Sequence, residues 1–154
     1  MSSYWLFKSE PSSFSLEDLI KGRSPEPWSG VRNFQARNFM RAMAVGDRAF
    51  FYHSSCPVPA IVGEVEVVTA AYPDHTAFDP EDHHYDPRAS KENPIWSMVD
   101  VAFREKYPRP VTLAELKDCP ALAPMRLLAR GNRLSVLPVS REEWDIIRGM
   151  SGRL

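Results

Sequence analysis

The sequence has few cysteines, no long apolar run and almost no net charge. Its two cysteines, Cys56 and Cys119, lie far apart without a close-spaced ligand pattern, which is typical of free thiols in a reducing compartment. No apolar run is long enough to span a bilayer, and Lys8 and Glu10 come too early for a signal peptide. We therefore expect a soluble, intracellular protein, cytoplasmic in a bacterium or nuclear in a eukaryote, with no membrane partner.

The charge balance excludes a strongly basic protein that binds polyanions over its whole surface. Lys and Arg total 19 against 20 Asp and Glu, so the formal net charge is −1. The local distribution is uneven, because arginines gather in residues 32–48 and 126–133 whereas residues 74–86 carry acids and no Lys or Arg. This separation predicts one basic face and one acidic loop, so any contact with nucleic acid must be local.

Motifs for catalysis are absent as well. The chain has no G-x-S-x-G nucleophile elbow, and its seven glycines are scattered rather than gathered in a phosphate-binding loop. His75, His83 and His84 stand among acids in residues 72–94, but they match no fixed metal-ligand spacing. We therefore predict no cofactor and no metal, and keep an enzyme acting on a modified nucleotide or nucleobase as an alternative.

The pattern of elements indicates one small mixed domain. A chain of 154 residues can bury a single core, and the 14 prolines favour short elements joined by fixed turns. Short capped helices and about five strands are expected, without βαβ alternation. The strands are predicted at residues 4–8, 47–53, 60–70, 95–103 and 134–139. This order predicts an α+β fold, a small, strongly bent mixed β-barrel with short peripheral helices, rather than a doubly wound sheet.

Two stretches near the middle of the chain carry more specific expectations. In the strand at 60–70, alternation places Ile61, Gly63, Val65 and Val67 on the buried face, and it places Glu64 and Glu66 on the other. Residues 72–94 form a connection long enough to be functional or mobile.

A helix is predicted over residues 34–43, with Asn33 as its N-cap. Its apolar positions recur at helical spacing, while Phe34, Arg37 and Arg41 form an outer stripe. The stripe is either a solvated arginine face or a surface on which the arginines reach phosphates and Phe34 stacks on a base.

A second polar cluster follows the first predicted strand. Lys8, Ser9 and Glu10 put a cation, a hydroxyl and a carboxylate at one rim of the barrel. Such a carboxylate can accept a hydrogen bond from an exocyclic amine such as that of cytosine, and Trp28 or Tyr52 can stack on the ring. The alternative is a structural salt bridge and turn.

Several blocks of the sequence resemble the EVE domain family, in collinear order over nearly the whole chain. They include Y-W-L-F-K-S-E-P at 4–11, W-S-G-V-R-N-F-Q-A-R-N at 28–38, I-V-G-E-V at 61–65, W-S-M-V-D-V at 96–101 and R-L-S-V-L-P-V-S at 133–140. The family is similar in fold to the PUA-like barrels, relatives of the YTH, ASCH and SRA domains. Phe34 and Leu137 depart from the tyrosine and glutamine expected there.

The resemblance implies a single, non-catalytic EVE (PUA-like) domain that holds a modified base, flipped out of DNA or RNA, in a barrel pocket. One family member is associated with methylated and hydroxymethylated cytosine, and a small-ligand module is a further alternative. The predicted base pocket consists of Lys8, Ser9, Glu10, Trp28, Arg32, Asn33, Tyr52, His53 and Ser135. The predicted contacts with the nucleic-acid backbone are Arg37, Arg41 and Arg130.

Overall fold

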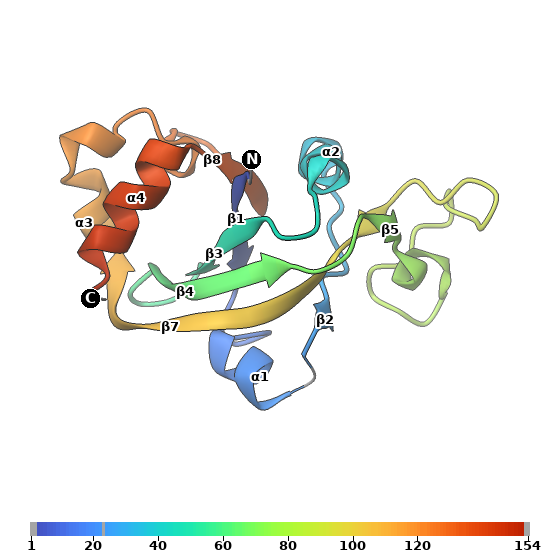
Figure 1. Ribbon diagram of the computed structural model, residues 1–154. Helices are drawn as coiled ribbons and strands as arrows, with labels where there is room; N and C mark the ends of the chain where they lie inside the picture. Colours follow the sequence, from blue (N-terminus) through green and yellow to red (C-terminus); the bar gives the residue numbers. More distant parts are fainter. Residues whose placement is uncertain (1–2, 23, 153–154) are drawn as a thin grey trace.

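A computed structural model describes residues 3–22 and 24–152 (Figure 1). None of the helices in these two ranges is long and apolar enough to cross a membrane. The elements are β1 (Tyr4–Ser9), α1 (Leu16–Lys21), β2 (Glu26–Pro27), α2 (Phe34–Ala42), β3 (Arg48–His53), β4 (Ala60–Val67), β5 (Tyr72–Pro73), η1 (His75–Phe78), β6 (Ser97–Met98), β7 (Asp100–Thr112), α3 (Leu113–Lys117), η2 (Pro120–Leu122), η3 (Arg126–Leu128), β8 (Val136–Val139) and α4 (Arg141–Met150).

Six strands form one curled sheet in the order β2-β7-β4-β3-β1-β8. Strand β1 runs parallel to β3, and the other neighbouring pairs are antiparallel. Figure 1 shows the sheet wrapped into a half-barrel, with α3 and α4 on one side and α2 beside the end that leads to β5. The predicted α+β fold, a bent mixed sheet with short peripheral helices, is therefore confirmed.

The sheet buries both of its faces. Trp5, Phe7 and Phe51 belong to one hydrophobic cluster, together with residues of α1 and α2. Leu6 and Phe50 belong to a second cluster, which includes residues of α3 and α4. Successive side chains of a strand point to opposite faces, so the continuous apolar runs of β1 and β3 fill both clusters.

The prediction of one buried and one exposed face for β4 is wrong in two places. Glu64 has no exposed surface, because the second cluster and α4 cover the face on which it was expected to meet solvent. Ile61 packs in the second cluster, whereas Val65 and Val67 pack in the first. The register of β4 against β7 shifts between Ile61 and Gly63, and such an irregularity moves the following residues to the other face.

The strand predicted at 95–103 is divided in the structure. Residues 97–98 form β6, which pairs with β5 in a separate two-stranded sheet, and β7 starts at Asp100 and continues to Thr112. Pro108 and Pro110 lie within β7, where the register against β4 jumps from Lys106 to Val111. Proline lacks the N–H that a ladder needs, so it is tolerated in such an irregular stretch.

The helix starts follow the local cap signals. Ser15, Thr112 and Ser140 form capping boxes at α1, α3 and α4, and Asn33 caps α2 by accepting a hydrogen bond from the Ala36 N–H at 2.9 Å. These contacts satisfy N–H groups that have no partner within the helix. They fix where α2 begins, and therefore how the preceding residues 28–33 run along the end of the sheet.

Candidate nucleic-acid interface

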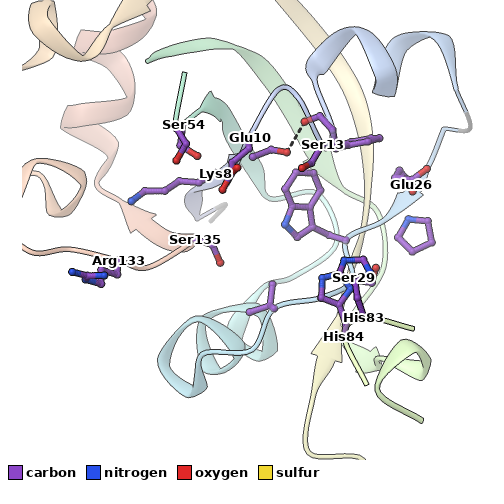
Figure 2. Close-up of a pocket in the computed structure, with 17 residues that line it drawn as sticks. Lys8, Glu10, Ser13, Glu26, Ser29, Ser54, His83, His84, Arg133 and Ser135 are labelled. Carbon is purple, nitrogen blue, oxygen red and sulfur yellow. Dashed lines mark hydrogen bonds between the residues drawn. The ribbon is translucent and has the colours of Figure 1, made fainter. Parts of the chain in front are cut away.

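A cavity of about 680 Å³ opens beside the end of β1 (Figure 2). Its walls come from five separate parts of the chain: the β1 end with the following turn, residues 26–31, residues 54–55, residues 83–84, and the segment that leads into β8. Of the predicted base-pocket residues, the structure places Lys8, Ser9, Glu10, Trp28 and Ser135 in this wall. Cavities of this size accommodate small organic ligands.

Trp28 is the aromatic part of the wall, and its position is rigid. The indole packs against Phe7 with ring centroids 5.0 Å apart and edge-on against Phe51 at 5.6 Å. The backbone N–H of Trp28 donates to the backbone carbonyl of Val99 at 2.8 Å. Because packing and a backbone hydrogen bond hold this residue, it offers a preformed apolar surface to a planar ligand.

The turn after β1 presents one carboxylate without a partner among the described residues. The Glu10 carbonyl accepts hydrogen bonds from the N–H groups of Ser13 and Phe14, and the Ser9 hydroxyl donates to the Phe14 carbonyl. These contacts shape the turn and leave the Glu10 side chain exposed beside the cavity. The carboxylate is therefore an available acceptor for a donor group of a ligand.

The opposite wall depends on a close approach between Gly30 and the loop of residues 72–94. Gly30 has a φ of +86°, and a Cβ at this position would come within 2.6 Å of the His84 ring. Its N–H donates to the Asp74 carboxylate at 2.8 Å. Only glycine allows both the left-handed backbone and this contact, and the imidazole rings of His83 and His84 reach the cavity as a result.

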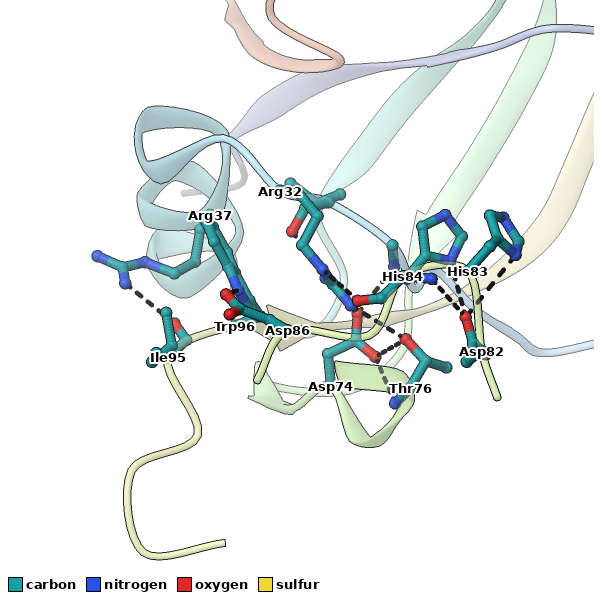
Figure 3. A network of polar contacts seen from close by, with 12 residues as sticks. Arg32, Arg37, Asp74, Thr76, Asp82, His83, His84, Asp86, Ile95 and Trp96 are labelled. Atoms are coloured by element: carbon teal, nitrogen blue, oxygen red, sulfur yellow. Dashed lines mark hydrogen bonds and ion pairs between the residues drawn. The ribbon is translucent and has the colours of Figure 1, made fainter. Parts of the chain in front are cut away.

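Arg32 links the same two segments from outside the cavity wall (Figure 3). Its guanidinium donates to the Asp74 carboxylate at 3.1 Å, to the Thr76 hydroxyl and to the His84 carbonyl. Burial alone would raise the pKa of Asp74, but hydrogen bonds from Thr76, the Gly30 N–H and Arg32 hold that pKa below its ordinary value. The predicted pocket residue Arg32 therefore positions the loop that contributes His83 and His84 to the wall.

Three further predicted pocket residues lie outside the wall. Asn33 is the N-cap of α2. Tyr52 is 4% exposed in the second hydrophobic cluster, where burial, followed by the nearby Cys56, raises its pKa. The His53 ring accepts a hydrogen bond from the Leu16 N–H at 3.1 Å, so it anchors the first turn of α1.

The His53 contact predicts that stability depends on pH. Burial lowers the pKa of His53, and the protonated ring has no lone pair left to accept from the Leu16 N–H. Its stabilising effect should be complete above an unfolded pKa of about 6.5 and be lost as the pH falls through that value toward the lower folded pKa. We expect the free energy of unfolding, measured with denaturant from pH 7.5 to 5.5, to fall less steeply in a His53→Gln variant. Burial also lowers the pKa of His84, but His84 contributes equally to the pH dependence of both proteins. Equal slopes of unfolding free energy against pH in the two proteins would therefore contradict the prediction.

The predicted backbone contacts lie elsewhere on the surface. Arg37 and Arg41 both donate to the Ile95 carbonyl, at 2.9 and 3.0 Å. Phe34 stacks on Trp96 with ring centroids 4.7 Å apart, and it remains 50% exposed. Arg130 is exposed in the segment before β8. The helix arginines thus support a segment that contains Ile95, a β-branched residue held at a φ of +59°; their contact with phosphates stays a prediction.

Sequence reasoning did not include Arg133, His83 and His84 in the pocket. Arg133 is the first residue of the block R-L-S-V-L-P-V-S, which also contains the predicted pocket residue Ser135, and this position in the block could have indicated that Arg133 lines the pocket. The histidines lie in the long connection of residues 72–94, for which the sequence indicates no position, and only the docking of that loop on Gly30 and Arg32 brings them to the cavity.

One group among the described residues has the donor types of a metal site. Ligand atoms of Asp82, His83 and His84 lie within 4.8 Å of one another, and imidazole and carboxylate are ligands that zinc accepts. The backbone N–H of His84 donates to the Asp82 carboxylate at 2.8 Å, and the His83 and His84 rings lie tilted by 42° with centroids 3.8 Å apart. In the structure, these contacts order the end of the loop beside the cavity.

Comparison with known proteins gives matches over most of the chain. The model of the EVE domain family matches residues 3–150. Thymocyte nuclear protein 1 of Gallus gallus is 48% identical, over 94% of this chain and 66% of the chicken protein. The human protein of the same name is 46% identical, over 96% of this chain and 73% of its own length. The chain thus spans about two thirds to three quarters of these relatives.

Two solved structures are similar throughout. A crystal structure of the human THYN1 protein in complex with DNA containing 5-methylcytosine superposes with a TM-score of 0.93 at 44% identity, covering 99% of both chains. A protein from Pseudomonas putida gives a TM-score of 0.92 at 49% identity, covering 97% of this chain and 99% of the other.

Proposed function

Since this chain belongs to the EVE domain family, we propose that it binds DNA and holds one modified cytosine, such as 5-methylcytosine, in the cavity beside β1. The observation that carries the proposal is a preformed cavity in which a rigid indole and a free carboxylate lie together. The human protein crystallised with 5-methylcytosine-containing DNA supports the choice of DNA and of cytosine.

The cavity has groups suited to both the face and the edge of a base. Trp28 offers an apolar surface for stacking, which is worth about 1–3 kcal/mol per base in proteins that bind single strands. Glu10 offers an acceptor for the exocyclic amine of cytosine, which is a hydrogen-bond donor. A base must leave its helix to reach such a cavity, and the resulting loss of stacking costs a few kcal/mol.

The proposed edge contact predicts a change in specificity rather than a general loss of binding. Glu10→Ala should remove about 1–3 kcal/mol of the preference for a duplex with one 5-methylcytosine over the unmodified duplex. We would measure paired dissociation constants for both duplexes at one salt concentration. Glu92→Ala, which removes an exposed carboxylate outside the cavity wall, is the matched control and should leave the ratio unchanged.

The same experiment addresses the alternatives. If Glu10→Ala keeps the full preference, the carboxylate does not read the base. If the unaltered protein prefers a modified RNA, or binds a free nucleoside more tightly than any duplex, that ligand replaces DNA as the proposed partner. Mass spectrometry of the recovered duplex should show an unchanged base, whereas a converted or excised base would support the enzyme alternative.

A further inference from the structure

We propose that Lys8 and Arg133 form a phosphate subsite at one end of the cavity, which takes the phosphate attached to the inserted nucleotide. This inference rests on the proposed function and assigns Lys8 to the phosphate rather than to the base edge. Phosphate is the shared chemistry of two sources, a phosphodiester within a strand and a free nucleoside monophosphate. We infer the first source and test both.

The charged groups of the cavity wall are segregated. Figure 2 shows Arg133 and Ser135 on one side of the cavity, and the Lys8 side chain extends to this side, with its amine toward Arg133 and away from Glu10. Ser29, His83 and His84 lie together at the far wall, and Glu26 lies near that side. One end of the cavity is therefore cationic, whereas the other parts offer imidazoles, an indole and carboxylates.

Lys8 is a cation without a counter-charge among the described residues. Its backbone N–H donates to the Ser135 carbonyl at 2.8 Å, which ties the end of β1 to the segment before β8. Its side chain is half-buried, and among residues 3–22 and 24–152 it has no ion pair. Burial lowers the pKa of Lys8, because an ammonium group that loses water without gaining an anion is disfavoured. An anion bound at this end would restore the lost stabilisation.

The contrast with other cations near the cavity makes Lys8 informative. Arg32 is occupied by Asp74, Thr76 and a carbonyl, and Arg37 and Arg41 both donate to Ile95. Arg133 is exposed on the segment that Lys8 holds in place. Hence Lys8 and Arg133, the Lys and Arg residues of the cavity wall, have no ion pair within the described ranges, and their donors are available to a ligand.

Phosphate is the anion that this arrangement fits. Arginine binds a phosphate with a planar fork of N–H groups and lysine adds a compact charge, so two cations can share one tetrahedral group. The hydrogen-bond acceptors on the edge of a nucleobase are neutral, so they compensate a buried ammonium less well than a phosphate does. A nucleotide with its base against Trp28 must carry its phosphate toward a cavity end, and Glu10 disfavours an anion beside it.

The test pairs a charge-removing variant with a charge-removing change in the ligand. Lys8→Gln and Arg133→Gln are compared with Arg130→Gln, which removes the same charge from an exposed residue of the same segment outside the cavity wall. The ligands are a duplex with one 5-methylcytosine and two versions that carry an uncharged methylphosphonate, immediately 5′ or 3′ of that nucleotide. Circular dichroism confirms that each variant is folded.

Lys8→Gln should weaken binding of the all-phosphate duplex by roughly tenfold, the range of a hydrogen bond to a charged group. The same substitution should change binding of one methylphosphonate duplex by less than about twofold, because its phosphate charge is already absent. Arg133→Gln should show the same pattern as Lys8→Gln, whereas Arg130→Gln should weaken binding of all three duplexes by one common factor. Equal losses for Lys8→Gln on all three duplexes would overturn the subsite.

The outcome separates this inference from the proposed function. If the unaltered protein prefers the methylated duplex but Lys8→Gln lowers the affinity for all three duplexes by the same factor, the proposed function stands and the subsite is wrong. A second arm compares 5-methyldeoxycytidine with its 5′-monophosphate by NMR titration. If the monophosphate binds through Lys8 while no duplex shows a methylation preference, the subsite stands and the DNA proposal fails.

Discussion

Replacing Asp74 by alanine is expected to release the loop of residues 72–94 from Gly30 and Arg32 and to weaken binding of methylated DNA by about tenfold or more. The Asp74 side chain is fully buried and accepts hydrogen bonds from the Gly30 N–H, Arg32 and Thr76. Breaking a buried ion pair on one side typically costs about 3–5 kcal/mol, since the remaining charge stays unpaired. The loop supplies His83 and His84 to the cavity wall, so its release opens that wall.

Hydrogen exchange of the amides in residues 72–94 is the direct measurement, together with the dissociation constant for the methylated duplex. Glu81→Ala is the matched control, because Glu81 is an exposed acid of the same loop and its loss changes the net charge equally. The control should keep both the protection of the loop and the affinity. Asp74→Ala with unaltered amide protection would show that the loop is held by other contacts.

The second large effect is expected on the other face of the sheet. Glu64→Ala should lower the free energy of unfolding by about 3–5 kcal/mol, which corresponds to a fall in melting temperature of about 6–20 °C for a domain of this size. Glu64 is buried and accepts from Arg48 at 2.9 Å, from the Tyr107 hydroxyl at 2.6 Å and from Arg148 at 2.8 Å. Burial and the bond to Glu64 raise the pKa of Tyr107. Loss of this carboxylate removes one acceptor from each of the three donors.

Denaturant unfolding measures the effect, and Glu66→Ala is its control on the same strand. Glu66 pairs with Arg104 at 2.8 Å with both side chains partly exposed, and exposed pairs contribute at most about 1 kcal/mol. We expect the Glu64 variant, at temperatures where it is folded, to retain the preference for methylated DNA, because its partners lie on the face that carries the second cluster. Equal destabilisation by the two substitutions would contradict this account of the network.

The charge pattern of the chain acquires a different meaning in the folded protein. The basic residues 32–48 and the acidic residues 74–86 were expected to form separate surfaces. In the structure they meet, because Arg32 pairs with Asp74, while Arg37 and Arg41 donate to the carbonyl of Ile95, which directly follows the loop of residues 72–94. Arg32 thus holds the loop that supplies His83 and His84 to the cavity wall, whereas Arg37 and Arg41 hold the segment at Ile95. Lys8 and Arg133 are the cations of the wall itself, and the proposed phosphate subsite is assigned to them.

What the sequence determined by itself is the local structure and the polar rim of β1. Asn33 begins its helix as predicted, and the expected short capped helices begin at Ser15, Thr112 and Ser140, because a cap is a contact between residues two or three positions apart. The family resemblance pointed to Lys8, Ser9, Glu10, Trp28 and Ser135, and these residues line the cavity. Both kinds of signal are carried by short stretches of chain.

Only the tertiary structure decided which distant residues share the cavity and which acids are buried. The burial of Glu64 follows from the coverage of both sheet faces, and the switch of Ile61 to the second cluster follows from the shifted register of β4 against β7. His84 reaches the cavity because Gly30 has no side chain to exclude it. Such contacts join residues tens of positions apart, and their energies depend on strand pairing and close packing, which alternation and spacing along one chain do not encode.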